Sequence, residues 1–208
     1  FCQERPKPVM ESVMFHAESS SMFKYLDLFD SEVIKCLGDY LDFELLNIDK
    51  NTDWITLSPN YSTEIIAGEG SGGVYVAYGE REIEKRSILF ISSEGQAGKL
   101  GNDLTEFVSM IIEIPYWFDL LKFSGGGQLS EMRKTAQFMF AEYNEEYPDY
   151  NKAKSILKEK LDLAHISDPI ALLHSCIQNS DCEVLASDGW KYESLFNTFV
   201  SSDNKAWK

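Results

Sequence analysis

The feature that most constrains the fold is a change in hydrophobic period near residue 43. From there to residue 100, short apolar runs alternate with turn residues, as in strands joined by tight turns. On both sides of this region, apolar residues recur at helical spacing. Neighbouring strands in such a series usually pair antiparallel, so the sequence predicts an α+β fold. The predicted strands are 43–48, 54–57, 63–67, 74–78, 88–92 and 97–100.

Helical spacing predicts the elements around the strands. Residues 9–42 are expected to form two helices, the second with Ser31 as its N-cap. Another helix is expected after Asp103, because Asp103 and Glu106 have the spacing of a capping box. The apolar stripe of the second helix is Val33, Ile34, Leu37 and Leu41.

After Pro115 the pattern predicts helices alone. One apolar stripe ends at Pro148, and a later helix begins at Asp168 with Pro169 in its first position. The glycine run 125–127 marks the predicted boundary between a core, 1–124, and a mainly helical C-terminal extension, 125–208, packed on it. The stripe before Pro148 is Met132, Ala136, Met139, Phe140, Tyr143 and Tyr147.

The charge of the chain restricts its partners. Its 208 residues include 34 acidic and 19 basic ones, a formal net charge of −15. Such a field repels phosphate backbones and anionic lipids and attracts basic proteins. We therefore expect a basic protein partner and no direct contact with nucleic acid or membrane. An acidic surface that only promotes solubility is the alternative.

The most acidic stretch is the candidate partner-binding region. Between Asp27 and Asp53 there are eight acidic residues and two lysines. Local charge density is the reason for choosing this stretch. The candidate residues are Asp27, Asp30, Asp39, Asp42 and Glu44.

Cysteine usage and the chain start favour a cytoplasmic protein. A core of this size needs no disulfides, so the four cysteines are expected to be reduced. No run approaches the about 18 apolar residues of a membrane span, and residues 1–8 lack the apolar stretch of a signal peptide. Because the first residue is Phe1 and not Met, a removed leader remains an open alternative.

Two glycine-rich runs are candidates for phosphate binding. The run GEGSGG at 68–73 matches a dinucleotide pattern, but a β-like run follows it where a helix is needed, and Glu69 would repel phosphate. It is interpreted as a strand-to-strand turn that depends on Gly70, Gly72 and Gly73. The run 124–127 precedes a helix and could hold an anion, although a flexible connection is favoured.

Catalytic and metal motifs are absent from the sequence. His16, His165 and His174 form no recognisable motif, and Cys176 and Cys182 fit neither a redox pair nor a zinc knuckle. With 34 acidic residues, carboxylate pairs arise by chance. The sequence therefore predicts neither a catalytic residue nor a cofactor.

Four segments in order resemble the SUKH superfamily. Residues 67–78 contain a Gly-Ser-Gly-Gly turn between two strands, and residues 87–100 contain a strand that ends in a Ser-Glu-Gly turn. Residues 102–108 match the Leu-x-x-Phe helix that follows, and residues 117–133 resemble the linker and helix of longer bacterial members. The resemblance covers about residues 30–135.

This resemblance implies a curved, mostly antiparallel sheet flanked by helices. It also implies an immunity protein that neutralises a toxin, often a nuclease, of a bacterial polymorphic or contact-dependent toxin system. The glycines at 70, 72 and 73 would define the fold and not a catalytic site. Alternatives are a small-ligand or phosphate-binding protein or enzyme that uses the glycine turns, and a scaffold with a non-toxin protein partner.

Overall fold

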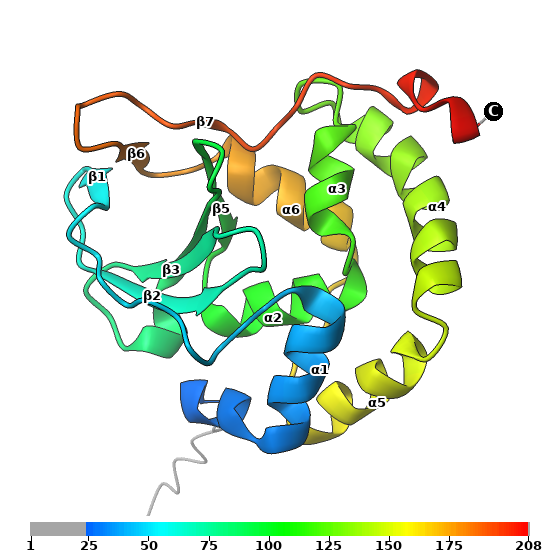
Figure 1. Cartoon of the computed structure of the whole chain (residues 1–208), viewed down its shortest axis with the longest axis horizontal. Helices are drawn as coiled ribbons and strands as arrows, with labels where there is room; N and C mark the ends of the chain where they lie inside the picture. Colours follow the sequence, from blue (N-terminus) through cyan, green and yellow to red (C-terminus); the bar gives the residue numbers. More distant parts are fainter. Residues whose placement is uncertain (1–23, 208) are drawn as a thin grey trace, which may run out of the picture.

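The computed structural model describes residues 24–207. Figure 1 shows the strands on one side and the arc of α4 and α5 on the other. The helices and 3-10 turns are η1 (Tyr25–Phe29), α1 (Ser31–Leu41), η2 (Ile83–Lys85), α2 (Leu104–Glu113), α3 (Trp117–Lys122), α4 (Leu129–Glu146), α5 (Tyr150–Lys160), α6 (Pro169–Gln178), η3 (Ser201–Asp203) and η4 (Lys205–Trp207). The strands are β1 (Thr56–Ser58), β2 (Thr63–Gly68), β3 (Val74–Tyr78), β4 (Ser87–Ile91), β5 (Gln96–Gly101), β6 (Glu183–Leu185) and β7 (Glu193–Ser194).

The main sheet has five strands in the order β2-β3-β4-β5-β7, and a second sheet pairs β1 with β6. Every pair in the main sheet is antiparallel except β5 with β7. The ladder shifts register between Ile65 and Ala67 and between Ile88 and Leu89, and such bulges bend a strand. The predicted α+β class, with a mostly antiparallel sheet and helices toward the C-terminus, is confirmed.

Two of the six predicted strands differ from the structure. The run 43–48 is not a strand but an isolated bridge of Glu44 with Gly68, because Asn47 has a positive φ of 59° that interrupts the extended backbone. The run 54–57 is reduced to β1, which begins at Thr56. The other four runs correspond to β2, β3, β4 and β5.

The start of α1 is set by Asp30 and not by Ser31. The Asp30 backbone is extended, with φ −60° and ψ 136°, and its carboxylate accepts hydrogen bonds from the amides of Glu32 and Val33. Ser31 already belongs to the helix, so the predicted N-cap is wrong by one residue. Most of the earlier helix predicted within 9–42 lies outside the described residues.

The helix α2 lies at the centre of the core. Asp103 caps it as predicted, because its carboxylate accepts a hydrogen bond from the Glu106 amide at 2.8 Å. The Glu106 carboxylate bonds the amide of Asn102 and not that of Asp103, so the reciprocal half of the capping box is displaced by one residue. Phe107 of α2 packs on Tyr75 of β3 with ring centroids 5.6 Å apart.

The C-terminal part of the chain adds strands as well as helices. β6 pairs with β1 and β7 pairs with β5, so the expectation of helices alone after Pro115 is wrong. These strands are only three and two residues long, which is too short for a hydrophobic period. Leu157, Leu173 and Leu195 join the same buried cluster as residues of α1 and α2.

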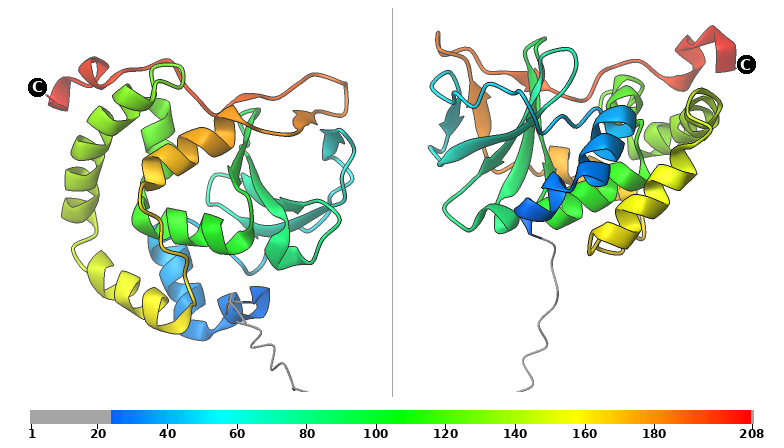
Figure 2. Two further views of the ribbon diagram at one scale, coloured as in Figure 1. Left: turned by 180° about the vertical axis from the view of Figure 1, so that it is seen from behind. Right: turned by 60° about the horizontal axis from the view of Figure 1, so that its bottom comes forward.

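The helical arc of α4 and α5 is joined to α1 and α2 by hydrogen bonds. From α3 the chain passes through α4 and α5 around α1 and returns through α6 to the sheet, as Figure 2 shows. The Tyr143 hydroxyl of α4 donates to the carbonyl oxygen of Tyr40 at 2.6 Å, and that of Tyr150 in α5 donates to Ile112 at 2.6 Å. Between residues 24 and 207, every helix falls short of the length or the apolar character that a membrane crossing requires.

Candidate functional site

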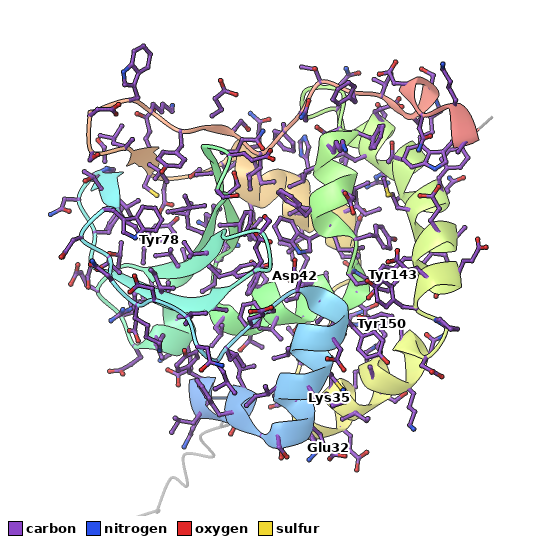
Figure 3. All side chains as sticks on the ribbon, viewed as in Figure 1. Glu32, Lys35, Asp42, Tyr78, Tyr143 and Tyr150 are labelled. Atoms are coloured by element: carbon purple, nitrogen blue, oxygen red, sulfur yellow. The ribbon has the colours of Figure 1, made fainter. Side chains whose placement is uncertain are left out.

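A cleft of about 250 Å³ lies where the helical arc meets the sheet. It is formed by the end of α1, the turn between β2 and β3, the start of α3 and the last turn of α4. Figure 3 labels Asp42 at the end of α1 and Tyr143 on α4, which both line it. Besides Leu41 and Pro115, its lining consists of eight aromatic residues and four acidic ones: Tyr40, Tyr75, Phe90, Tyr116, Trp117, Phe118, Tyr143, Tyr147, Asp42, Glu69, Asp119 and Glu146.

The floor of the cleft is a cluster of buried rings. Tyr75, Phe90 and Trp117 are at most 3% exposed. The ring centroids of Tyr75 and Phe90 are 5.0 Å apart, and those of Phe90 and Trp117 are 5.3 Å apart. Edge-to-face and tilted packing of this kind fixes the rings in place. The floor is therefore rigid and apolar.

The rim is also aromatic, but it remains accessible. Tyr143 and Tyr147 are half-buried and stack with ring centroids 4.7 Å apart. Tyr116 lies 6.1 Å from Tyr143, between centroids, and is half-buried as well. Burial raises the pKa of the Tyr143 and Tyr116 hydroxyls, so both remain neutral at physiological pH. The rim thus offers neutral ring surfaces to a ligand.

Acidic side chains repel one another at this site. Burial raises the pKa of the Asp119 carboxyl, Lys122 opposes that rise, and the charges of Glu146 and Glu142 add to it. On the opposite wall, burial and the charge of Glu69 raise the pKa of Asp42. The cleft therefore carries an excess of negative charge that is only partly compensated within the chain.

The glycine-rich turn beside the cleft is occupied by the chain's own carboxylates. The Glu69 carboxylate accepts hydrogen bonds from the amides of Ser71 and Gly73, each at 2.7 Å. Asp42 accepts one from the amide of Gly70 at 2.9 Å. The bonds from Ser71 and Gly73 outweigh the effect of burial and lower the pKa of Glu69, which stays ionised. A phosphate would have to displace these carboxylates.

The second glycine run is bonded within the chain as well. The Gly125 amide donates to the carbonyl oxygen of Phe199 at 2.8 Å, and the Gly127 amide faces the Ser124 hydroxyl at 3.4 Å. The carbonyl oxygen of Gly127 contacts His174 Nε2 at 2.8 Å. These bonds tie the run to the C-terminal segment and to α6. Its amides are not arranged to receive an anion.

The five acidic residues chosen from the sequence have different roles. Asp27 bonds the Lys24 amide, Asp30 caps α1 and pairs with Lys160, and Asp39 pairs with Lys35 on its own helix. The other two are Asp42, which lines the cleft, and Glu44, which is exposed.

No group of three or more histidine, cysteine, aspartate or glutamate side chains that could hold a metal ion is found between residues 24 and 207. His165 is exposed, whereas Cys36, Cys176 and Cys182 are buried and unbonded to one another. Burial raises the pKa of Cys176 to about 12, which leaves the thiol protonated and unreactive. Cys2 and His16 lie outside the described residues.

A larger cleft lies beside the strands β5, β6 and β7. It measures about 520 Å³ and has a mixed lining that includes both Lys191 and Glu183. These two side chains form an ion pair, and Glu193 in the lining adds one further negative charge. Tyr192 is the one aromatic residue in this lining, whereas the acidic cleft has eight aromatic and four acidic residues and is the better functional candidate.

Sequence reasoning missed most of the acidic cleft. The sequence indicates Asp42 as a candidate partner-binding residue, but it does not indicate Asp119 or Glu146. It predicts Tyr143 and Tyr147 only as part of the apolar stripe of a helix. Two aromatic residues one helical turn apart beside an acidic residue were the available signal.

Comparison of the chain with family models, with curated proteins and with solved structures gives no match.

Proposed function

We propose that this protein is a non-catalytic binding protein whose partner is a basic protein. The observation that carries the proposal is the cleft with four acidic side chains, eight aromatic ones and, among its lining residues between 24 and 207, no basic one. Aromatic residues dominate the binding energy of protein interfaces, and like charges at a site favour a partner of the opposite sign.

The charge of the whole chain supports the same partner. A net charge of −15 attracts basic surfaces over distances up to about one Debye length, roughly 8–10 Å at physiological salt. Such steering raises the rate of encounter, while buried contacts decide how long the complex lasts. A basic partner would therefore be captured quickly and held at the aromatic cleft.

The identity of the partner is inferred from the resemblance of residues 67–133 to SUKH proteins. By that resemblance the chain is a cytoplasmic immunity protein, and its partner is a toxin domain of a bacterial polymorphic or contact-dependent system. A nuclease is a suitable toxin, because its active site must attract phosphate. An inhibitor rich in carboxylates can occupy that site as a mimic of the nucleic-acid backbone.

A phosphate-binding or enzymatic function has less support. The amides of the β2–β3 turn are bonded to Glu69 and Asp42, and that of Gly125 is bonded to Phe199. A scaffold with a non-toxin partner would use the same cleft and the same charge. Purified protein is expected to show no nuclease or phosphatase turnover, and turnover abolished by one substitution would contradict a pure binding role.

The test is to sequence the reading frames next to this gene and to co-express the protein with a toxin domain encoded there. We expect cells that express both proteins to grow, and the purified proteins to form a stoichiometric complex by calorimetry. The control is an unrelated toxin domain of equal positive charge, against which no protection is expected. Protection against both would reduce the function to non-specific charge neutralisation, and protection against neither would refute the immunity function.

A further inference from the structure

We propose that the cleft between α1, α3 and α4 binds the guanidinium group of an arginine side chain presented by the protein partner. This inference rests on the proposed function and adds the ligand chemistry of the site. The feature that carries the proposal is the cavity itself, in which flat rings and carboxylates come together from six separate segments of the chain.

The size of the cleft selects a single side chain. Its volume of about 250 Å³ is below the roughly 300–1,000 Å³ of sites for drug-sized ligands and cofactors. The end of one long side chain suits this volume. The buried floor of Tyr75, Phe90 and Trp117 is too well packed to open further without loss of core contacts.

The charge of the cleft selects a cation. Asp119 and Glu146 repel each other across one wall, and Asp42 and Glu69 repel each other on the opposite one. Among residues 24–207, Lys122 is the one cation that acts on Asp119, and it is exposed on the same helix. A bound cation would relieve both repulsions, and carboxylates form stronger hydrogen bonds with cationic donors than with neutral ones.

The rings select guanidinium over ammonium. A guanidinium group is planar and weakly hydrated, so it can stack on an aromatic face while its N–H groups bond carboxylates. The half-buried Tyr116, Tyr143 and Tyr147 supply ring surfaces next to Glu146. An ammonium group is a strongly hydrated point charge and would lose more hydration for fewer hydrogen bonds.

The site exists only because the helical arc is docked. Tyr143 is fixed by the hydrogen bond from its hydroxyl to the Tyr40 carbonyl oxygen, which joins α4 to the end of α1. The Tyr75 hydroxyl faces the carbonyl oxygen of Asp42 at 3.4 Å and positions the opposite wall. The rings and the carboxylates of Asp42 and Glu69 are therefore held in place before a ligand arrives, which reduces the entropic cost of binding.

The test uses the full chain and the blocked tripeptide acetyl-Gly-Arg-Gly-amide as probe. Binding is followed by NMR through the indole and tyrosine ring signals, with the citrulline and lysine tripeptides as matched probes. We expect shifts at Trp117 and Tyr143 with arginine, weaker shifts with lysine and none with the neutral citrulline isostere. Equal shifts with citrulline, or shifts confined to other residues, would overturn the proposal.

Neighbouring residues on α4 supply a matched pair of variants. Both Glu146 and the adjacent Glu145 are exposed, but only Glu146 lines the cleft. Because Glu146→Gln removes a charged acceptor, we expect it to weaken arginine-probe binding about fivefold, and Glu145→Gln to change it less than about twofold. Equal effects of both variants would mean that general charge, and not the cleft, attracts the probe.

The outcomes separate this inference from the proposed function. Failure of the probe to bind, while the toxin domain still forms a complex, would refute the arginine site and leave the binding function intact. Loss of the toxin complex in Glu146→Gln, with the complex of Glu145→Gln unchanged, would support both. If the probe bound but no toxin complex formed, the proposed function would be refuted. The claim that a protein partner presents the arginine would also be refuted, and only the binding of a guanidinium group by the cleft would stand.

Discussion

The amide of Gly126 donates a hydrogen bond to the carbonyl oxygen of Asn197 at 2.8 Å. Asn197 in turn donates its own amide to the carbonyl oxygen of Leu121 at 3.1 Å. These two hydrogen bonds attach the C-terminal segment to the turn between α3 and α4. The glycine run 125–127 in that turn is therefore not a flexible linker. The C-terminal segment therefore supports the junction of α3 and α4, at the ends of these helices that lie away from the acidic cleft.

We predict that the C-terminal aromatic contacts stabilise the fold. The Trp207 ring stacks on Phe138 at 5.2 Å between centroids and lies 4.7 Å from Phe123. Because stacked pairs contribute about 0.5–1.5 kcal/mol beyond burial, Trp207→Ala should lower the free energy of unfolding by about 1–2 kcal/mol in urea denaturation. Trp190→Ala is the control, since that side chain is 77% exposed. Equal losses in both variants would contradict the supporting role.

The glycines of the β2–β3 turn should not tolerate larger residues. A Cβ atom on Gly73 would lie 2.8 Å from the Phe90 ring, and Gly72 has φ +98°, which disfavours other residues. Replacing either glycine with valine should therefore cost more than about 1 kcal/mol of stability. Thermal unfolding is the measurement.

Gly38 provides the opposite control for this experiment. It lies inside α1, and a Cβ atom there would meet no atom within 4 Å. Gly38→Ala should therefore stabilise the protein by about 0.5–1 kcal/mol through helix propensity. If Gly73→Val melted like the wild type while Gly38→Ala behaved as expected, close packing at the turn would be disproved.

The pH dependence of stability should have opposite signs at two aspartates. The folded state raises the pKa of Asp119, mainly through burial, so ionised Asp119 costs stability above its ordinary pKa of 3.8. Asp119→Asn should then stabilise the protein at pH 7, by at most about 1 kcal/mol because the side chain is partly exposed. The gain should vanish below that ordinary value, where the carboxyl is protonated in both states.

Asp30 is the counterpart with the reverse sign. The hydrogen bond from Lys160 and those from the Val33 and Glu32 amides lower its pKa. Its ionised form therefore adds stability above the ordinary pKa of 3.8, which is lost as the pH falls through the lowered value. Because asparagine is an equally good N-cap, Asp30→Asn should destabilise at pH 7 through the lost ion pair alone. Stability curves from pH 2 to 8 for both variants test the two signs, and parallel curves would contradict them.

Association with the basic partner should depend on the acidic stretch. Neutralising Asp39, Asp42 and Glu44 together should slow association about threefold or more and flatten its salt dependence. Because Asp39 is paired with Lys35 and only Asp42 lines the cleft, the double variant Asp39→Asn/Glu44→Gln should show a smaller effect. The measurement is the association rate by stopped flow at two ionic strengths. An unchanged association rate in the triple variant would mean that the partner docks elsewhere.

The sequence was most informative where local spacing alone decides a structure. The period-2 runs that became β2 to β5, the Asp103 cap and the turn at 68–73 depend on residues a few positions apart. The strand expected at 43–48 was wrong for a local reason as well, because Asn47 adopts a left-handed conformation that asparagine tolerates and sequence rules rarely predict.

By itself the sequence therefore determined the α+β class, the strands β2 to β5 and the acidity of the chain. Tertiary structure alone decided where acidic and aromatic side chains gather into the candidate site. Asp42, Asp119 and Glu146 come from α1, α3 and α4, and only the docking of the arc through Tyr143 brings them together. The strands β6 and β7 likewise form because β1 and β5 offer unpaired backbone groups to a segment too short to specify a strand itself.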